Sequence, residues 1–171
     1  RRGWHPTSIL GHLSAAAACA ALLRLPPESM DRAMGHAAVQ AGGLMAAAGT
    51  MSKALIVGKA AMSGVMAAQL AEAGALAPHG MVGGAEKGLM ATLFQDSTQP
   101  ALDGLGGTWQ VLQNTFKPYP ACQLAHASFD AARLAGQRIR PERIRSVIAH
   151  VNPFALTVAR HWRPTTPLES R

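Results

Sequence analysis

Small side chains at helical spacing dominate the first hundred residues, and this pattern most constrains the fold. Alanine, glycine and methionine fill the apolar faces of three predicted helices, at 7–24, 27–41 and 58–73. Small side chains let helix axes approach closely, and methionine fills irregular gaps between them. A short fourth helix is predicted at 85–94. We therefore predict that residues 1–104 form part of a tightly packed, all-helical domain.

The pattern changes after a turn-forming run at 96–108. Residues 109–115 and 144–151 alternate as strands do, and residues 122–136 between them have helical spacing. This order predicts a small α/β domain over 105–171. The predicted fold class is therefore mainly α, with part of an all-helical domain followed by a small α/β (α+β) domain.

Composition and motifs exclude several classes of function. The chain has 171 residues, of which 49% are apolar, so it is long enough to bury one core. Its longest strictly apolar run, 15–23, is too short to cross a bilayer. The two cysteines stand far apart in unrelated contexts, so we predict reduced thiols, a cytoplasmic location and no metal. Phosphate-loop, dinucleotide, nucleophile-elbow and zinc-protease motifs are absent, and we predict no cofactor.

The basic C-terminal third raises a nucleic-acid-binding alternative. Residues 118–171 carry eight arginines against three acidic residues. The arginines lack interleaved aromatic residues and a reader motif, so we rank this alternative last and predict neither a nucleic acid nor a membrane as partner. Charged residues make up only 15% of the chain, and the small-residue helices leave apolar surface. This combination predicts a homodimer.

Three segments place a titratable side chain beside proline, glycine or a predicted helix start. His5 stands between Trp4 and Pro6 in GWHPT, where the backbone is constrained and the imidazole can donate or accept a proton. Lys53 ends GTMSK, and Lys117 is held in TFKPYPAC. For each lysine, a side chain that merely reaches from an apolar face to water stays an open alternative.

The combination of one histidine and two cations suits proton abstraction beside a carboxylate. The base removes the proton, and the lysines neutralise the substrate carboxylates and the charge that develops. His12 also falls on the predicted first helix, but it has no neighbouring carboxylate or thiolate that would complete a metal site. We predict that His12 is solvated.

The same segments, extended, resemble the MmgE/PrpD family, which includes 2-methylcitrate dehydratase, cis-aconitate decarboxylase and iminodisuccinate epimerase. They are GWHPT, VQAGGLMAAAGTMSKALIVGKAAMSG and TFKPYPACQLAHASFDA, and they follow the family's order over nearly the whole chain. The resemblance implies a large helical domain, a smaller α/β domain, homodimers and metal-independent chemistry on small di- or tricarboxylates. The site that follows from it has His5, Lys53 and Lys117 as catalytic residues and Thr7, Tyr119 and His126 as substrate-binding residues.

The chain departs from the family pattern in two ways. Family members commonly have a histidine in a K-x-L-H pattern after the first lysine, where this chain has Ile56, so the exact substrate stays open. Members are also longer, and we expect this chain to be a central fragment. The leading hypothesis is a lyase, a dehydratase similar to 2-methylcitrate dehydratase, with decarboxylation and epimerisation as open variants. The alternative is an inactive truncated fragment retained as a packing or oligomerisation unit.

Overall fold

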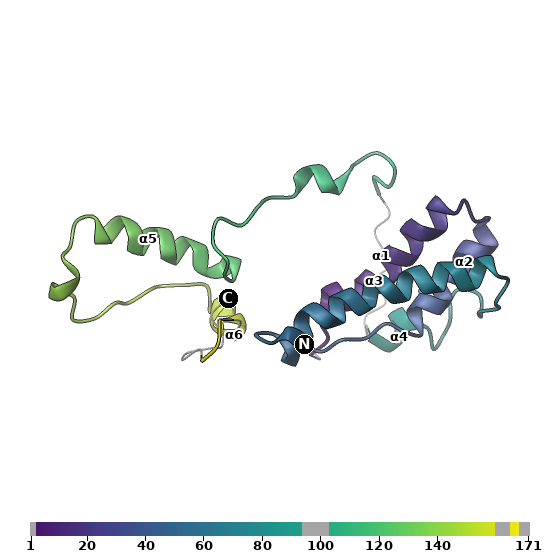
Figure 1. The fold of residues 1–171 in the computed structure, drawn as a ribbon, viewed down its shortest axis with the longest axis horizontal. Coiled ribbons are helices and arrows are strands. Elements are labelled where there is room, and N and C mark those ends of the chain that lie inside the picture. The colour runs from purple at the N-terminus through teal and green to yellow at the C-terminus, as the bar shows by residue number, and fades with distance from the viewer. Residues whose placement is uncertain (1–2, 94–102, 160–164, 168–171) are drawn as a thin grey trace. The chain divides into compact units, whose positions relative to one another are not determined.

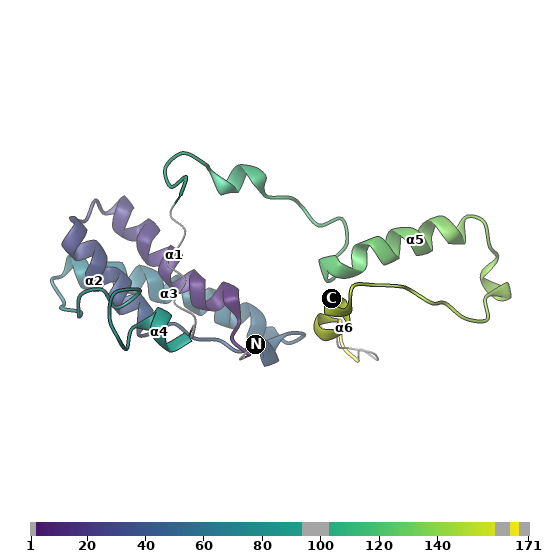
Figure 2. The same cartoon turned by 180° about the vertical axis from the view of Figure 1, so that it is seen from behind.

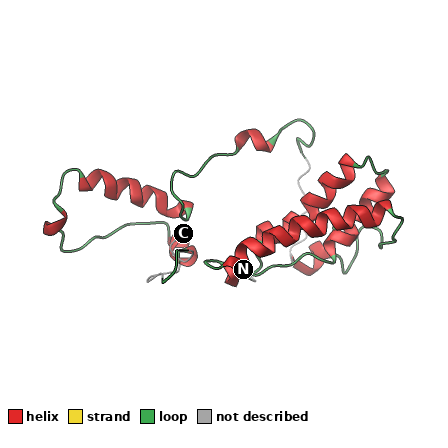
Figure 3. Cartoon of the chain, in the orientation of Figure 1, coloured by secondary structure: helices red, strands yellow, loops and turns green. Residues whose placement is uncertain are grey.

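The chain forms two compact units, Arg1–Asp103 and Gly104–Arg171, and each is described by itself. The structure is a computed structural model that describes residues 3–93, 103–159 and 165–167 (Figure 1). Within these ranges every extended regular element is a helix, as Figure 3 shows. The mainly helical class is therefore confirmed.

Three helices make the body of the first unit. They are α1 (Pro6–Leu22), α2 (Pro27–Ala38) and α3 (Met51–Glu72), accompanied by the 3₁₀ turn η1 (Met45–Ala47) and the short α4 (Leu89–Leu93). Figures 1 and 2 show α1 and α3 side by side. Nearly all of the fully buried apolar side chains of these three helices are alanines: Ala16, Ala20, Ala33, Ala37, Ala60, Ala67, Ala68 and Ala71.

Helices α1 and α3 run parallel and pack at close range. The Ser8 Oγ lies 3.2 Å from the Ile56 carbonyl oxygen. A Cβ added to Gly64 would lie 2.4 Å from the Cβ of Ala15, so only glycine fits there. Contacts therefore advance in the same direction along both helices, and their N-termini lie at the same end.

The start of α3 differs from the prediction. The helix begins at Met51 rather than near residue 58, after Gly49 at φ +79° and the N-cap Thr50. The sequence pattern missed this start because residues 51–57 are mostly exposed and carry no buried periodic face. The helix ends close to the predicted residue 73, and Gly74 follows it with φ +83°.

By length and composition, α3 is apolar enough to cross a membrane, with a mean hydropathy of 1.5. The longest strictly apolar run of the sequence did not reveal this. A core helix passes the same test, and α3 packs its alanine-rich face against both α1 and α2. We therefore describe α3 as the central helix of the unit.

The short helix predicted at 85–94 is present only as α4, and residue 94 lies outside the described residues. Residues before it form turns, closed by hydrogen bonds such as Leu89 N to Met81 O at 2.8 Å. Residues 96–102, which are part of the predicted turn-forming run, also lie outside the described residues.

In the second unit, the predicted helix is confirmed and the strands are not shown. Helix α5 spans His126–Gly136, after the 3₁₀ turn η3 (Gln123–Ala125). The prediction of a strand at 109–115 is wrong, because Gln110–Gln113 forms a 3₁₀ turn, η2. Residues 144–152 have no ladder partner among the described residues, so the α/β character of this unit is not shown. The turn η4 (Pro141–Arg143) and helix α6 (Pro153–Val158) complete the unit.

Candidate active site

His5 is the N-cap of α1. Its backbone is extended, and its Nδ1 accepts a hydrogen bond from the Ser8 amide at 3.2 Å. The side chain is buried, with 6% of its surface exposed. Hydroxyl, carboxylate and amide side chains are the common N-caps, and Thr7, the first residue of the predicted helix, carries a hydroxyl. The imidazole takes that role here because the lone pair on Nδ1 can reach the amide three residues ahead.

A loop around Gly43 fixes the backbone on either side of His5. The His5 amide donates to the Gly43 carbonyl at 3.0 Å, and the Met45 amide donates to the Gly3 carbonyl at 2.7 Å. The Ser8 hydroxyl donates to the Gly42 carbonyl. Gly43 has φ +137°, and a Cβ there would lie 2.5 Å from Ser8 Oγ. The loop therefore holds the start of α1 from the side, and sequence reasoning missed it.

His12 is buried, so the prediction that it is solvated is wrong. Only 1% of its surface is exposed, because α1 lies against both α2 and α3. Its Nδ1 donates to the Ser8 carbonyl at 2.6 Å. Its Nε2 has no hydrogen-bond partner within the described part of the chain.

Lys53 lies in the first turn of α3, at the same end of the unit as His5. Residue 8 lies beside 56, and one helical turn toward the N-termini brings His5 level with Lys53. Lys53 is exposed. Among the described residues, no side chain caps the N-terminus of α3, and the Lys53 amide donates to the Thr50 carbonyl at 3.2 Å. Thr7, also exposed, lies in the first turn of α1.

Lys117 and His126 meet at one backbone oxygen in the second unit. The Lys117 Nζ donates to the Ala121 carbonyl at 3.3 Å, and the His126 Nε2 donates to the same oxygen at 3.2 Å. The proline-flanked turn between them bends the chain so that residues 117 and 126 face the same atom. Lys117 is exposed, and His126 is half-buried.

Tyr119 packs within the same turn and is tied to α5. Its ring meets the ring of His126 edge-on at 5.2 Å and that of Phe129 at 5.4 Å. Its hydroxyl donates to Asp130 Oδ1 at 2.6 Å. This hydrogen bond, helped by partial burial and by the carboxylate charge, raises the pKa of Tyr119 above its ordinary value, while Arg133 opposes the shift. Asp130 is a site neighbour that sequence reasoning missed, although its spacing after KPYP places it on α5.

The structure thus gathers the predicted residues into two groups, one in each unit. His5, Thr7 and Lys53 lie at the N-terminal ends of α1 and α3, and Lys117, Tyr119 and His126 lie around one turn. No group of three or more His, Cys, Asp or Glu side chains able to hold a metal ion occurs among the described residues.

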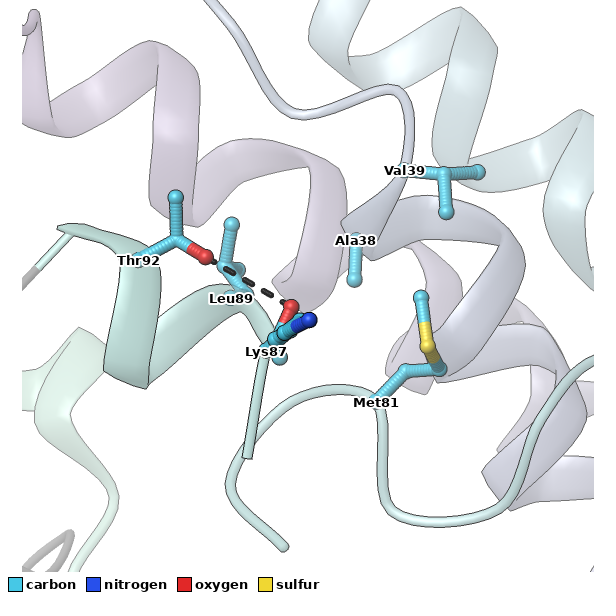
Figure 4. A pocket seen from close by; sticks show the side chains of 7 residues that line it. Ala38, Val39, Met81, Lys87, Leu89 and Thr92 are labelled. Carbon is cyan, nitrogen blue, oxygen red and sulfur yellow. Dashed lines mark hydrogen bonds between the residues drawn. The ribbon is translucent and has the colours of Figure 1, made fainter. Parts of the chain in front are cut away.

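A separate shallow pocket of about 190 Å³ contains none of these residues. Figure 4 shows Ala38, Met81, Leu89 and Lys87 around it. The Thr92 hydroxyl donates to the Lys87 carbonyl at 3.5 Å at its edge. Its lining is mainly apolar, and its one lysine is exposed. It is therefore not the candidate active site.

Helix N-termini favour bound anions, and His5 and Lys53 lie at the N-termini of two helices. Residues 1–102 match the MmgE/PrpD N-terminal domain, and the chain belongs to the MmgE/PrpD family.

Curated relatives agree with this assignment. The chain is 32% identical to a cis-aconitate decarboxylase of Aspergillus terreus over 75% of this chain and 28% of the relative. It is 33% identical to the human cis-aconitate decarboxylase over 82% of this chain and 29% of the relative. The mouse cis-aconitate decarboxylase is 30% identical over 91% of this chain and 32% of its own length. The chain therefore spans about a third of these relatives.

Proposed function

We propose that this chain belongs to a lyase that transfers a proton next to a carboxylate of a small di- or tricarboxylate, without a metal. The observation that carries the proposal is the register of α1 and α3, which brings His5 level with Lys53 at the positive ends of two helices. Similarity to cis-aconitate decarboxylases supports a dehydratase or decarboxylase reaction.

The residues have distinct roles in this proposal. One substrate carboxylate binds at the open N-terminus of α3, where Lys53 adds a positive charge to the helix dipole. Within the second unit, Lys117 and His126 are proposed to bind a carboxylate oxygen, because both already donate to one acceptor, the Ala121 carbonyl. Tyr119 holds the turn through Asp130, and Thr7 offers its hydroxyl beside His5.

Turnover by the full chain tests the proposal. Cis-aconitate, citrate and 2-methylcitrate are each incubated with the protein. The assay measures loss of substrate, release of carbon dioxide and formation of hydrated or dehydrated products. Turnover of any of the three is expected to fall strongly in Lys53→Ala. Lys59→Ala is the matched control, because Lys59 is exposed on the same helix but lies almost two turns further from His5. Equal activity of the two variants contradicts the site.

A second candidate function is an inactive fragment that acts as a packing or oligomerisation unit. Absence of turnover in the folded wild type would favour it.

We also propose a homodimer, because α3 exposes apolar side chains such as Met51 (76% exposed), Leu55 (70%) and Met62 (63%). Light scattering of the purified chain tests this, and a clean monomer contradicts it. A cytoplasmic location is proposed with it, since both Cys19 and Cys122 are free thiols.

A further inference from the structure

Ser8 is fully buried in α1, and all three of its polar groups hydrogen-bond to other residues. Its amide donates to the His5 carbonyl at 3.1 Å and to His5 Nδ1 at 3.2 Å. Its carbonyl accepts from the buried His12 Nδ1 at 2.6 Å. Its hydroxyl lies beside two backbone carbonyls, that of Gly42 and that of Ile56, the second at 3.2 Å. Ser8 therefore contacts the start of α1, the loop after α2 and helix α3.

The Ser8 side chain is the one that hydrogen-bonds from α1 to α3 within the described part of the chain. A serine hydroxyl has a single proton, so the Gly42 and Ile56 carbonyls share one donor. These two carbonyls belong to different elements, and both lie within reach of the same oxygen. The position of the loop is therefore coupled to the position of α3 through one atom.

The loop after α2 packs tightly on Ser8. A Cβ added to Gly43 would lie 2.5 Å from Ser8 Oγ and 2.7 Å from Ser8 Cβ. The same loop accepts the His5 amide at the Gly43 carbonyl, at 3.0 Å, and its Met45 amide donates to the Gly3 carbonyl at 2.7 Å. The contact of the loop with Ser8 thus sets the backbone on both sides of His5.

The contact between Ser8 and Ile56 lies about one helical turn from both His5 and Lys53. Residues 5 and 8 are three positions apart along the chain, and so are residues 53 and 56. A shift of α1 against α3 at this contact therefore moves His5 relative to Lys53 by a similar distance. In a catalytic site, a displacement of about 1 Å can lower the rate by about 10²-fold.

We propose that Ser8 is a positioning residue of the candidate site, whose hydroxyl holds the loop and α3 against the start of α1 and so aligns His5 with Lys53. Its role in catalysis rests on the proposed function, because Ser8 acts through these two residues and takes no part in a chemical step. Loss of the hydroxyl leaves the Gly42 and Ile56 carbonyls without this donor, so the loop and α3 are no longer held at one point.

Amide hydrogen exchange tests the positioning role and needs no activity. Exchange of the His5 and Met45 amides, which donate across the loop, is measured by nuclear magnetic resonance in the wild type and in Ser8→Ala. The amide of Ala67, in the core of α3, is the internal reference. Loss of one hydrogen bond is expected to speed exchange of the two loop-bonded amides by about fivefold to tenfold relative to that of Ala67.

Ser63→Ala is the matched control for this substitution. Ser63 is also a buried serine, with 1% of its surface exposed, but it lies roughly three turns beyond Lys53 along α3. We expect no selective change at the His5 and Met45 amides in this variant. An equal effect of the two variants, or faster exchange of all the amides alike in Ser8→Ala, overturns the proposal.

Steady-state kinetics with cis-aconitate, citrate and 2-methylcitrate separates positioning from stability. At a temperature at which thermal melts show every variant to be folded, a merely destabilised protein keeps its kcat. We expect kcat of Ser8→Ala to fall by about 10-fold to 100-fold with little change in KM, since Lys53 stays exposed and able to bind a carboxylate. Ser63→Ala should keep the kcat of the wild type.

A folded Ser8→Ala variant with the kcat of the wild type overturns the positioning role. If Ser8→Ala does not fold, Ser8→Cys replaces it in both experiments, because it differs by one atom and a thiol is only a weak donor. If the wild type turns over none of the three substrates, the proposed function fails, and hydrogen exchange still decides whether Ser8 holds the loop against His5. The two failures are therefore distinguishable.

Discussion

Gly64→Ala tests whether the close approach of α1 and α3 holds the first unit together. A Cβ at residue 64 would lie 2.4 Å from Ala15 Cβ, 2.7 Å from Ala16 N and 2.9 Å from Ala15 C. Two of these three atoms belong to the backbone of α1, which no rotamer change can move. The helices must therefore separate before an alanine fits.

The size of the effect follows from two opposing terms. Ordinary contact begins at 3.4 Å, so the closest pair must open by about 1 Å, and overpacking of this kind costs about 1–3 kcal/mol. Because backbone atoms are involved, we take the upper end of this range, about 3 kcal/mol, as the cost of overpacking. Alanine gains about 1 kcal/mol over glycine in a helix interior. The net loss is about 2 kcal/mol, which lowers Tm by about 4–8 °C for a chain of this size.

Gly58→Ala is the matched control for this substitution. Gly58 lies on the same helix, is exposed, and has nothing within 4 Å of an added Cβ. Only the propensity term applies, so we expect a gain of about 0.5–1 kcal/mol. Thermal and urea melts followed by circular dichroism measure both variants. If Gly64→Ala is as stable as Gly58→Ala, the helices do not pack at the distance described.

Three further predictions concern the loop and the two groups of site residues. Gly43→Ala should lower the free energy of unfolding by about 1–3 kcal/mol in urea melts, while Gly42→Ala changes it little, because only Gly43 combines φ +137° with an occupied Cβ position. Tyr119 is the single tyrosine, so phenolate absorbance reports its pKa, which should fall toward the ordinary value in Asp130→Asn. The stability that this bond adds is present below about pH 10 and is lost as pH rises through the higher folded-state pKa. Lys53→Ala should raise KM for a tricarboxylate without lowering Tm, since Lys53 is exposed.

The helices of the first unit were predictable because their alanine and methionine faces repeat at helical spacing. The first two turns of α3 are exposed on most sides, so their sequence has no buried face that repeats at helical spacing. For this reason the sequence pattern did not predict the start of α3. The strands predicted in the second unit show the opposite error. Alternation at 109–115 also fits a short 3₁₀ turn, and a strand forms only where a neighbour supplies hydrogen bonds.

Sequence reasoning predicted candidate site residues but not their surroundings. The segments around His5, Lys53 and Lys117 were found from their local chemistry. The contacts of His5 with Ser8 and with the loop at Gly43 were not, because they depend on a backbone amide and on a glycine conformation. The burial of His12 was missed for a similar reason, since only the packing of three helices produces it.

His5 has two roles that can be measured separately, and the separation decides how a loss of activity is interpreted. Its Nδ1 caps α1, and loss of an N-cap costs about 0.5–2 kcal/mol, so His5→Ala should lower Tm by roughly 1–8 °C as well as abolish turnover. Asparagine is among the strongest N-caps, and its side-chain oxygen can accept the Ser8 amide. His5→Asn should therefore keep a Tm close to that of the wild type while it lacks the imidazole. Turnover and thermal melts of both variants, measured side by side, test this. A stable His5→Asn with full turnover would show that the imidazole serves only as a cap, whereas a stable and inactive one places the imidazole in the chemistry.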